Sequence, residues 1–193
     1  FNTETIQQNV TEKELKLIVE ACRRNERHAQ NVLYNKLYGF AHSICRRYAH
    51  NESEIVDLVQ DGFFKVFMKM DYYSDELSFY AWFKKVFINT CIDHHRQYLR
   101  EVPTEELTPA ADKPFNGDVL IHIDADHLLY LVQSLPAAYR TVFNLYAIEG
   151  YGYQEIADIL HVSIGTVKSN IFKARERLKL AINQINTSHN YER

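Results

Sequence analysis

The stretch from Gly150 to Leu178 reads GYGYQEIADILHVSIGTVKSNIFKARERL, and it decides the fold. Apolar residues recur at helical spacing on both sides of a short break at His161, which predicts two helices joined by a tight turn. Histidine tolerates the left-handed backbone that such a turn requires. Ser163 is placed to cap the second helix, because its hydroxyl can accept from the free N–H groups of the first turn. The sequence therefore predicts a helix-turn-helix over about residues 153–172, an arrangement that many proteins use to read DNA.

The second of these helices has two different faces. Apolar residues at helical spacing should face a core: Val167, Ile171, Ala174 and Leu178. The other face mixes hydroxyl, amide and cationic side chains: Thr166, Lys168, Ser169, Asn170, Lys173, Arg175 and Arg177. Amides and hydroxyls can read base edges, and cations bind phosphates. The alternative is an amphipathic hairpin whose charged face is merely solvated.

Charge is distributed unevenly along the 193 residues. The net charge is −3, yet residues 165–183 carry five cations and one acid, whereas residues 101–126 carry seven acids and one lysine. The acidic stretch contains three prolines and breaks helical periodicity, which predicts a flexible linker over residues 101–125. We expect an all-α protein with two small helical domains, residues 11–100 and 126–186, and frayed ends at 1–10 and 187–193.

A second block, residues 54–70, reads EIVDLVQDGFFKVFMKM and is strongly periodic. Its predicted core face consists of Ile55, Leu58, Val59, Val66, Phe67 and Met70. Its other side carries acidic, amide and large apolar groups: Asp57, Gln60, Asp61, Phe64 and Met68. Such a mixture on an exposed face predicts a protein-binding surface. The alternative is that Phe64 and Met68 make a second core contact and the acids are ordinary surface residues.

The third block, residues 71–100, combines a polar loop with a long helix rich in aromatic and basic residues. Its apolar residues predict an inward face: Phe79, Phe83 and Val86, joined by Thr90. Lys85, Asn89 and Arg96 share another side, which suits a nucleic-acid backbone with an amide to read a base.

These blocks together resemble the bacterial RNA polymerase sigma factors of the extracytoplasmic-function group. EIADIL followed by SIGTVKSNIFKARERL resembles region 4.2, although Gly152 and His161 depart from the family's usual cap and turn residues. Residues that match region 4.1 are Leu135, Pro136, Arg140, Val142 and Phe143. Asp57, Gln60 and Asp61 match the D-x-x-Q-D/E-x-F segment of region 2.2. The pattern W-x(6)-N-x(3)-D-x(2)-R of regions 2.3 and 2.4 is matched by Trp82, Asn89, Asp93 and Arg96.

The resemblance implies a transcription initiation factor that is not itself an enzyme and has no catalytic residues, cofactor or metal site. Its core-polymerase contacts, to the clamp helices of the largest subunit, would be Asp57, Gln60 and Asp61, with Phe64 on the same face. Its minus-10 DNA contacts would be Tyr72, Tyr73, Ser74, Lys85, Asn89 and Arg96. In the family this part captures an unstacked base in a pocket, and the resemblance implies that the wall of the pocket is formed by Tyr72, Tyr73, Ser74 and Asp75. The basic face of residues 166–177 would read the minus-35 element. The family is commonly restrained by an anti-sigma protein, often membrane-anchored, which is a further expected partner. The sequence has no apolar run of membrane-spanning length and no secretory segment, which predicts a soluble, cytoplasmic protein.

Two other classes of function remain open at this point. A stand-alone helix-turn-helix regulator explains the C-terminal half but leaves the 54–70 surface unused, and a helical adaptor leaves the basic face unexplained. Adjacent His94 and His95 point about 100 degrees apart on a helix, which argues against a shared metal ion. The three cysteines, Cys22, Cys45 and Cys91, are expected to be reduced core residues.

Overall fold

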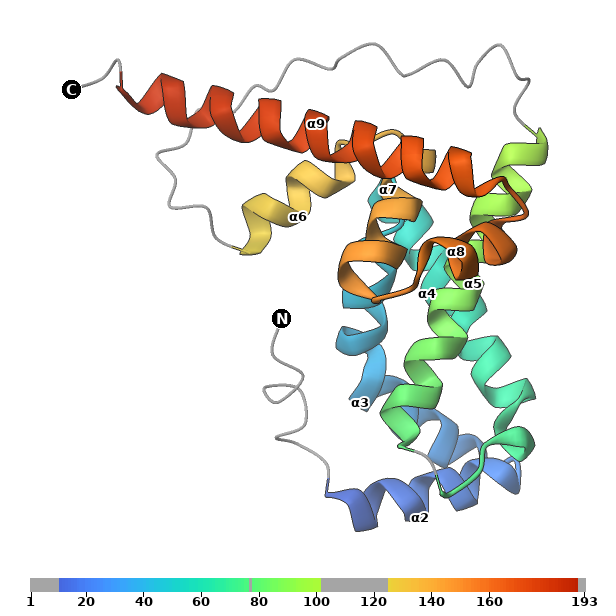
Figure 1. The fold of residues 1–193 in the computed structure, drawn as a ribbon. Helices are drawn as coiled ribbons and strands as arrows, with labels where there is room; N and C mark the ends of the chain where they lie inside the picture. Colours follow the sequence, from blue (N-terminus) through green and yellow to red (C-terminus); the bar gives the residue numbers. More distant parts are fainter. Residues whose placement is uncertain (1–10, 77, 102–124, 191–193) are drawn as a thin grey trace. The chain divides into compact units, whose positions relative to one another are not determined.

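The computed structural model describes residues 11–76, 78–101 and 125–190, and within these ranges every regular element is helical (Figure 1). The chain separates into two compact units, residues 1–93 and 94–193, and we describe each by itself. Most of the predicted linker, residues 102–124, lies outside the described residues, as do the predicted frayed residues 1–10 and 191–193. Among the helices that are described, none combines the length and the apolar character needed to cross a membrane.

Unit 1 begins with two helices, α2 (Glu12–Arg23) and α3 (Arg27–Cys45). Thr11 caps α2, since its Oγ1 accepts a hydrogen bond of 3.2 Å from the backbone N–H of Glu14. Asn25 follows α2 with φ 58°, and this left-handed residue ends the helix. An ion pair of 3.0 Å between Lys36 Nζ and Glu14 Oε1 connects the two helices.

The predicted helix over 54–70 is confirmed as α4 (Glu52–Met68), which begins two residues earlier than expected. Asn51 caps it, because the Asn51 side chain accepts from the Glu54 backbone N–H at 2.9 Å. A single 3₁₀ turn, η2 (Met70–Tyr72), follows and leads into the loop before α5 (Phe79–Glu101). Helix α5 crosses the boundary between the two units.

Aromatic rings fill the core of unit 1. The Phe83 and Phe87 ring centroids are 4.6 Å apart, and Phe63 meets Phe87 edge-on at 5.4 Å. Gly62 is required here, because a Cβ atom at this position would lie 2.2 Å from Cε1 of Phe87. The predicted core residues of α4 and α5 are buried, except that Phe67 is only half-buried. Helices α4 and α5 are therefore held in close contact along their apolar sides, which leaves their other sides available.

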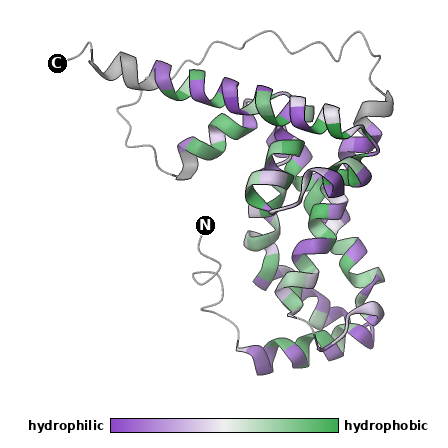
Figure 2. Ribbon diagram, in the orientation of Figure 1, coloured by the Kyte–Doolittle hydropathy of each residue, from purple (hydrophilic) through white to green (hydrophobic). Residues whose placement is uncertain are grey.

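Unit 2 contains α6 (Ala125–Gln133), α7 (Ala137–Phe143), the π-helical turn η3 (Asn144–Ile148), α8 (Tyr153–Leu160) and α9 (Ile164–Asn190). Its core is aliphatic: Leu131, Val132 and Leu135 pack with Ala174 and Leu178. Figure 2 shows hydrophobic and hydrophilic residues alternating along α9, as expected for a helix with one buried side. Helix α9 extends through Asn190, so it includes residues 187–190 of the predicted tail.

A buried arginine connects α6 to α7. Arg140 is only 1% exposed, and its Nη1 donates a hydrogen bond of 2.8 Å to the backbone oxygen of Gln133. Gln133 is the last residue of α6, where carbonyl groups lack intrahelical partners and a positive charge is favourable. The arginine that matched the family pattern in the sequence is thus part of the scaffold of unit 2.

The three cysteines are free and buried, as the sequence predicts for core residues. Burial, with a smaller effect from the charge of Glu26, raises the pKa of Cys22 to about 11. A hydrogen bond with Cys45, followed by burial, raises the pKa of Cys91 well above its usual value. The Cys22 and Cys91 thiols are therefore protonated and unreactive near neutral pH.

Candidate nucleic-acid and protein interfaces

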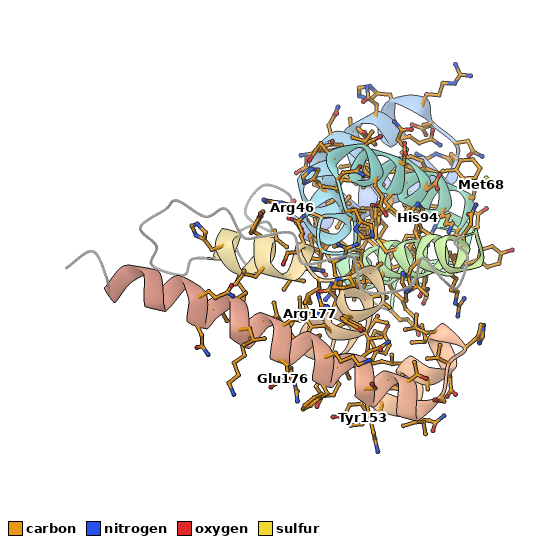
Figure 3. The ribbon with its side chains drawn as sticks, turned by 90° about the horizontal axis from the view of Figure 1, so that it is seen from above. Arg46, Met68, His94, Tyr153, Glu176 and Arg177 are labelled. Carbon is orange, nitrogen blue, oxygen red and sulfur yellow. The ribbon has the colours of Figure 1, made fainter. Side chains whose placement is uncertain are left out.

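The outer face of α4 presents the mixed surface that the sequence predicts. Asp57, Gln60 and Asp61 are exposed, and two large apolar side chains stand beside them, Phe64 at 65% and Met68 at 66% exposure. Figure 3 shows Met68 at the outer edge of α4. The alternative of a second core contact for Phe64 and Met68 does not hold within unit 1. We call the five residues Asp57, Gln60, Asp61, Phe64 and Met68 the α4 face.

Two adjacent phenylalanines on α4 have opposite roles. The phenylalanine of the D-x-x-Q-D/E-x-F pattern is Phe63, which is buried against Phe83 and Phe87. Phe64, one position later, points about 100 degrees away around the helix and is exposed. The patterned phenylalanine thus sets the orientation of α4, and its neighbour contributes apolar surface.

The predicted minus-10 residues divide into exposed and buried groups. Tyr72 is 83% exposed, and Ser74 is exposed beside it. Tyr73, in contrast, is buried, with its ring 5.2 Å from Phe79 and 5.3 Å from Trp82. Tyr73 therefore anchors the loop to the start of α5. This corrects the expectation that its ring helps to form the wall of a base pocket.

The side of α5 that was predicted to face DNA is largely open. Lys85 and Asn89 are exposed, and Arg96 is partly buried. Asp93, which belongs to the family pattern, forms an ion pair of 3.0 Å with Lys65 of α4. Because the Asp93 side chain is 56% exposed, this pair contributes at most about 1 kcal/mol. It helps to align α5 with α4 but does not determine the fold.

The helix-turn-helix has the local geometry that the sequence predicts. His161 ends α8 with φ 55° and ψ 44°, a left-handed conformation. Ser163 caps α9, since its Oγ accepts from the Thr166 backbone N–H at 3.0 Å. At the start of α8, Gly152 has no side chain to act as acceptor, but Glu155 Oε2 accepts from the Gly152 N–H at 2.7 Å. The glycine that departs from the family pattern is thus compensated by Glu155.

The polar side of α9 is accessible over most of its predicted DNA-binding residues. Thr166, Lys168, Ser169, Lys173 and Arg175 are exposed. The remaining two, Asn170 and Arg177, are partly buried. The predicted apolar side is buried, and it consists of Val167, Ile171, Ala174 and Leu178. We call the seven polar residues the α9 face.

Tyrosine rings lie beneath the four cations of the α9 face. Lys168 Nζ lies 5.8 Å from the Tyr153 ring centroid, and the Arg175 guanidinium lies 5.3 Å from that of Tyr146. The Tyr146 and Tyr153 rings are stacked on each other, 5.0 Å apart and within 3° of parallel. The hydrogen bond from Tyr153 lowers the pKa of Tyr146, and a second hydrogen bond, from Arg175, lowers it further. Tyr153 and Arg177 are labelled in Figure 3.

A third ring serves the other two cations. Lys173 Nζ and the Arg177 guanidinium lie 5.8 and 5.7 Å from the Tyr139 ring centroid, and Tyr139 also packs on the aliphatic core. Each exposed cation–ring contact contributes about 0.5–1 kcal/mol, enough to favour one orientation of a long side chain. The sequence patterns do not point to these tyrosines. They lie at intervals of seven residues before α9 but belong to α7, η3 and α8, so no single helical period reveals them.

Comparison with known protein families identifies both halves of the chain. Residues 33–101 match the family model described as Sigma-70 region 2, and residues 126–178 match Sigma-70, region 4. The RNA polymerase sigma-H factor of Pseudomonas aeruginosa is 28% identical over 185 residues, which cover 90% of this chain and 96% of that protein. The ECF RNA polymerase sigma-E factor of Haemophilus influenzae is 26% identical over 176 residues, covering 84% and 92%.

The chain belongs to the sigma-70 family of bacterial RNA polymerase sigma factors, in its extracytoplasmic-function (ECF) group. As a sigma factor it directs RNA polymerase to promoters. Among solved structures, the sigma factor RpoE in complex with the anti-sigma factor NepR from Bartonella quintana is 24% identical with a TM-score of 0.46, covering 89% of this chain and 96% of that one. The α4 face and the predicted minus-10 residues lie inside the region 2 match, and the α9 face lies inside the region 4 match.

Proposed function

We propose that this ECF sigma factor assigns each step of promoter recognition to a different surface. The α4 face binds the clamp helices of the largest subunit of core RNA polymerase. The loop at Tyr72, Ser74 and Asp75, with Lys85, Asn89 and Arg96 of α5, binds and opens the minus-10 element. The α9 face enters the major groove at the minus-35 element.

The chemistry of the α4 face supports a protein partner. Phe64 and Met68 leave apolar surface in water that a partner can cover, and burial of such surface is the main driving force of association. Asp57, Gln60 and Asp61 surround it with groups that can form directional hydrogen bonds and ion pairs. A central apolar anchor with a polar rim is the usual composition of an interface. Acidic groups at this position also disfavour DNA, whose phosphates they repel.

The chemistry of the α9 face supports DNA. Its four cations can replace counterions on phosphates, while Thr166, Ser169 and Asn170 can form hydrogen bonds with base edges. The helix begins at a capped turn, so its first residues are held in a defined position, as in other helix-turn-helix proteins. Tyrosine rings under the cations reduce the side-chain freedom that binding would otherwise remove.

The minus-10 surface in unit 1 suits an unpaired strand. Extrusion of a base costs a few kcal/mol, which stacking and edge hydrogen bonds can offset. Tyr72 offers an exposed ring for stacking, and Asn89 offers an amide. Lys85, exposed on the same side of α5 as Asn89, can bind the backbone.

Each DNA contact is weak alone and gains strength from tethering. When core polymerase holds the factor, the second contact becomes intramolecular and takes place at high effective concentration. We therefore expect the free chain to bind promoter DNA poorly. The chain contributes binding and positioning only and uses no cofactor, so nucleotide chemistry belongs to the polymerase.

An anti-sigma protein is the remaining proposed partner, on the basis of the family resemblance. A partner that covers the α4 face or the α9 face would hold the factor inactive in the cytoplasm, or at the membrane if that partner is anchored there. Such a protein must compete with core polymerase, and a partner that binds without displacing core would contradict this proposal.

The observation that carries the proposal is the presence of two exposed faces of different chemistry within the two matched regions. Its test is transcription by purified full-length chain and bacterial core polymerase on a library of promoter fragments. We expect discrete run-off transcripts that are lost with Asp57→Ala plus Gln60→Ala and retained with Leu17→Ala, an exposed control on α2. Sequence-specific DNA binding by the chain alone, with no transcripts, would instead support a stand-alone regulator.

A further inference from the structure

Arg23 connects α2 to the loop that we assign to the minus-10 element. It is the last residue of α2 and precedes the region 2 match, which begins at residue 33. Its Nη2 donates a hydrogen bond of 2.5 Å to the backbone oxygen of Tyr73, about fifty residues away in sequence. Its two terminal nitrogens also lie 3.4 Å from the two carboxylate oxygens of Asp75. Arg23 is thus a contact between distant segments within unit 1.

The same guanidinium is held in place from two further directions. It lies 5.6 Å from the Tyr73 ring centroid, within the range of a cation–ring interaction. Glu20, one turn earlier on α2, accepts from Nη1 at 2.5 Å. Only 22% of the Arg23 side chain is exposed. A planar group fixed by helix, ring and carboxylate is a defined support rather than a mobile surface charge.

These contacts bracket the one loop residue between Tyr73 and Asp75. Arg23 binds both neighbours of Ser74, while the Tyr73 ring packs on Phe79 and Trp82 at the start of α5. Tyr72 and Ser74 stay exposed. The loop backbone is therefore anchored on both sides of the residues that face solvent.

We propose that Arg23 is a positioning residue for minus-10 recognition, which holds the Tyr73–Asp75 backbone so that Tyr72 and Ser74 are preorganised for the captured base. This inference rests on the proposed minus-10 role of the loop. Arg23 acts through the loop and does not itself touch DNA. Preorganisation of this kind increases affinity, because the loop loses less freedom when the base binds.

Lysine cannot fully replace this arginine. An ammonium group can donate to the Tyr73 oxygen but cannot present a flat fork to both Asp75 oxygens at the same time. Neighbouring Arg24 provides a matched control, since its side chain is more exposed and pairs with Glu26 instead of the loop. Arg24→Ala therefore removes one positive charge from the end of α2 and leaves the loop contacts intact.

The test uses full-length chain bound to core polymerase and a single-stranded DNA that carries the minus-10 element of a promoter selected by run-off transcription. Each base is removed in turn to give abasic probes, and the position with the largest loss of affinity identifies the captured base. We expect Arg23→Ala to weaken binding of the intact probe roughly tenfold and to bind the abasic probe as the wild type does. Arg23→Lys should be intermediate, and Arg24→Ala should match the wild type.

Other outcomes separate failure of this inference from failure of the proposed function. If wild-type holoenzyme does not discriminate between intact and abasic probes, the minus-10 role of the loop is wrong. If it discriminates and Arg23→Ala discriminates equally well, the inference is overturned. Equal weakening on intact and abasic probes, with a lower melting temperature, would also overturn it, because Arg23 would then only stabilise unit 1.

Discussion

The α4 face and the α9 face are both exposed helix surfaces, but they differ in what lies beneath their functional side chains. On α4, the apolar side chains of Phe64 and Met68 are exposed to solvent. On α9, each of the four cations lies over a tyrosine ring of the same unit. Exposed apolar surface contributes to binding only when a partner buries it. A cation that is already held in position binds phosphate more tightly, because less side-chain freedom is lost on binding. The difference indicates a protein partner for the first face and DNA for the second.

The largest expected effect comes from removal of the apolar anchor of the α4 face. Phe64→Ala should weaken binding to core polymerase by about 2 kcal/mol or more, roughly thirtyfold, because a central aromatic residue is typically a hot spot. Binding of the labelled chain to core, measured by fluorescence anisotropy, checks this. Leu17→Ala removes an equally exposed apolar side chain on α2 and should have no effect. If both variants lose the same amount of affinity for core polymerase, the α4 face is not the polymerase-binding surface.

The next effect concerns the scaffold that orients the α4 face. Gly62→Ala should destabilise unit 1 by about 1–3 kcal/mol, because the new methyl group overlaps the Phe87 ring. Gly39 of α3 is the matched control, since a Cβ atom there meets nothing within 4 Å. Gly39→Ala should stabilise by about 0.5–1 kcal/mol, the usual gain at a helical glycine. Thermal unfolding followed by circular dichroism measures both, and a stable Gly62→Ala variant would mean that α4 and α5 are not in close contact.

A smaller effect is expected when one cation of the α9 face is removed. Arg175→Ala should weaken holoenzyme binding to duplex DNA carrying the minus-35 element by about 1 kcal/mol and reduce the salt dependence by about one counterion. Affinity measured across a salt series tests both. Lys179→Ala removes the same charge four residues later on α9, outside the face, and should change affinity less. If Lys179→Ala has the larger effect, the DNA-binding residues of α9 lie closer to its C-terminal end than the α9 face.

The smallest effect isolates the tyrosine support. Tyr146→Leu should lower minus-35 affinity by about 0.5–1 kcal/mol, because Arg175 loses the ring beneath it. Tyr146→Phe keeps the ring and should retain most of the affinity. The α4 face offers no equivalent variant, because its apolar residues Phe64 and Met68 are exposed. An equal loss for the leucine and phenylalanine variants would show that the phenol hydroxyl, and not the ring, matters.

Local rules are why much of this fold is predictable from sequence. The Thr11 and Ser163 caps, the left-handed Asn25 and His161, and the buried side of α9 each follow from a few neighbouring residues. The α4 face is predictable for the same reason, because the period of 3.6 residues places Leu58 and Val59 on one side of α4 and Asp57, Asp61 and Phe64 on the other.

Contacts between distant segments are what the sequence does not reveal. Gly62 against Phe87 and Arg23 against Tyr73 depend on how helices pack, and no local spacing encodes either contact. Tyr73 was expected beside Tyr72 in the base pocket, but Tyr72 is exposed and Tyr73 is buried against Phe79 and Trp82. The domain limits and the assignment of individual residues to polymerase or DNA stay predictions.

The most direct test of the central claim compares DNA binding by the chain alone and by the chain on core polymerase. The probe is a promoter fragment selected by run-off transcription, with a scrambled fragment as competitor. We predict weak, salt-sensitive and nonspecific binding by the free chain, and tight, specific binding once core is added. Tight, sequence-specific binding by the free chain, unchanged by core polymerase and by Phe64→Ala, would contradict the division of work between the two faces.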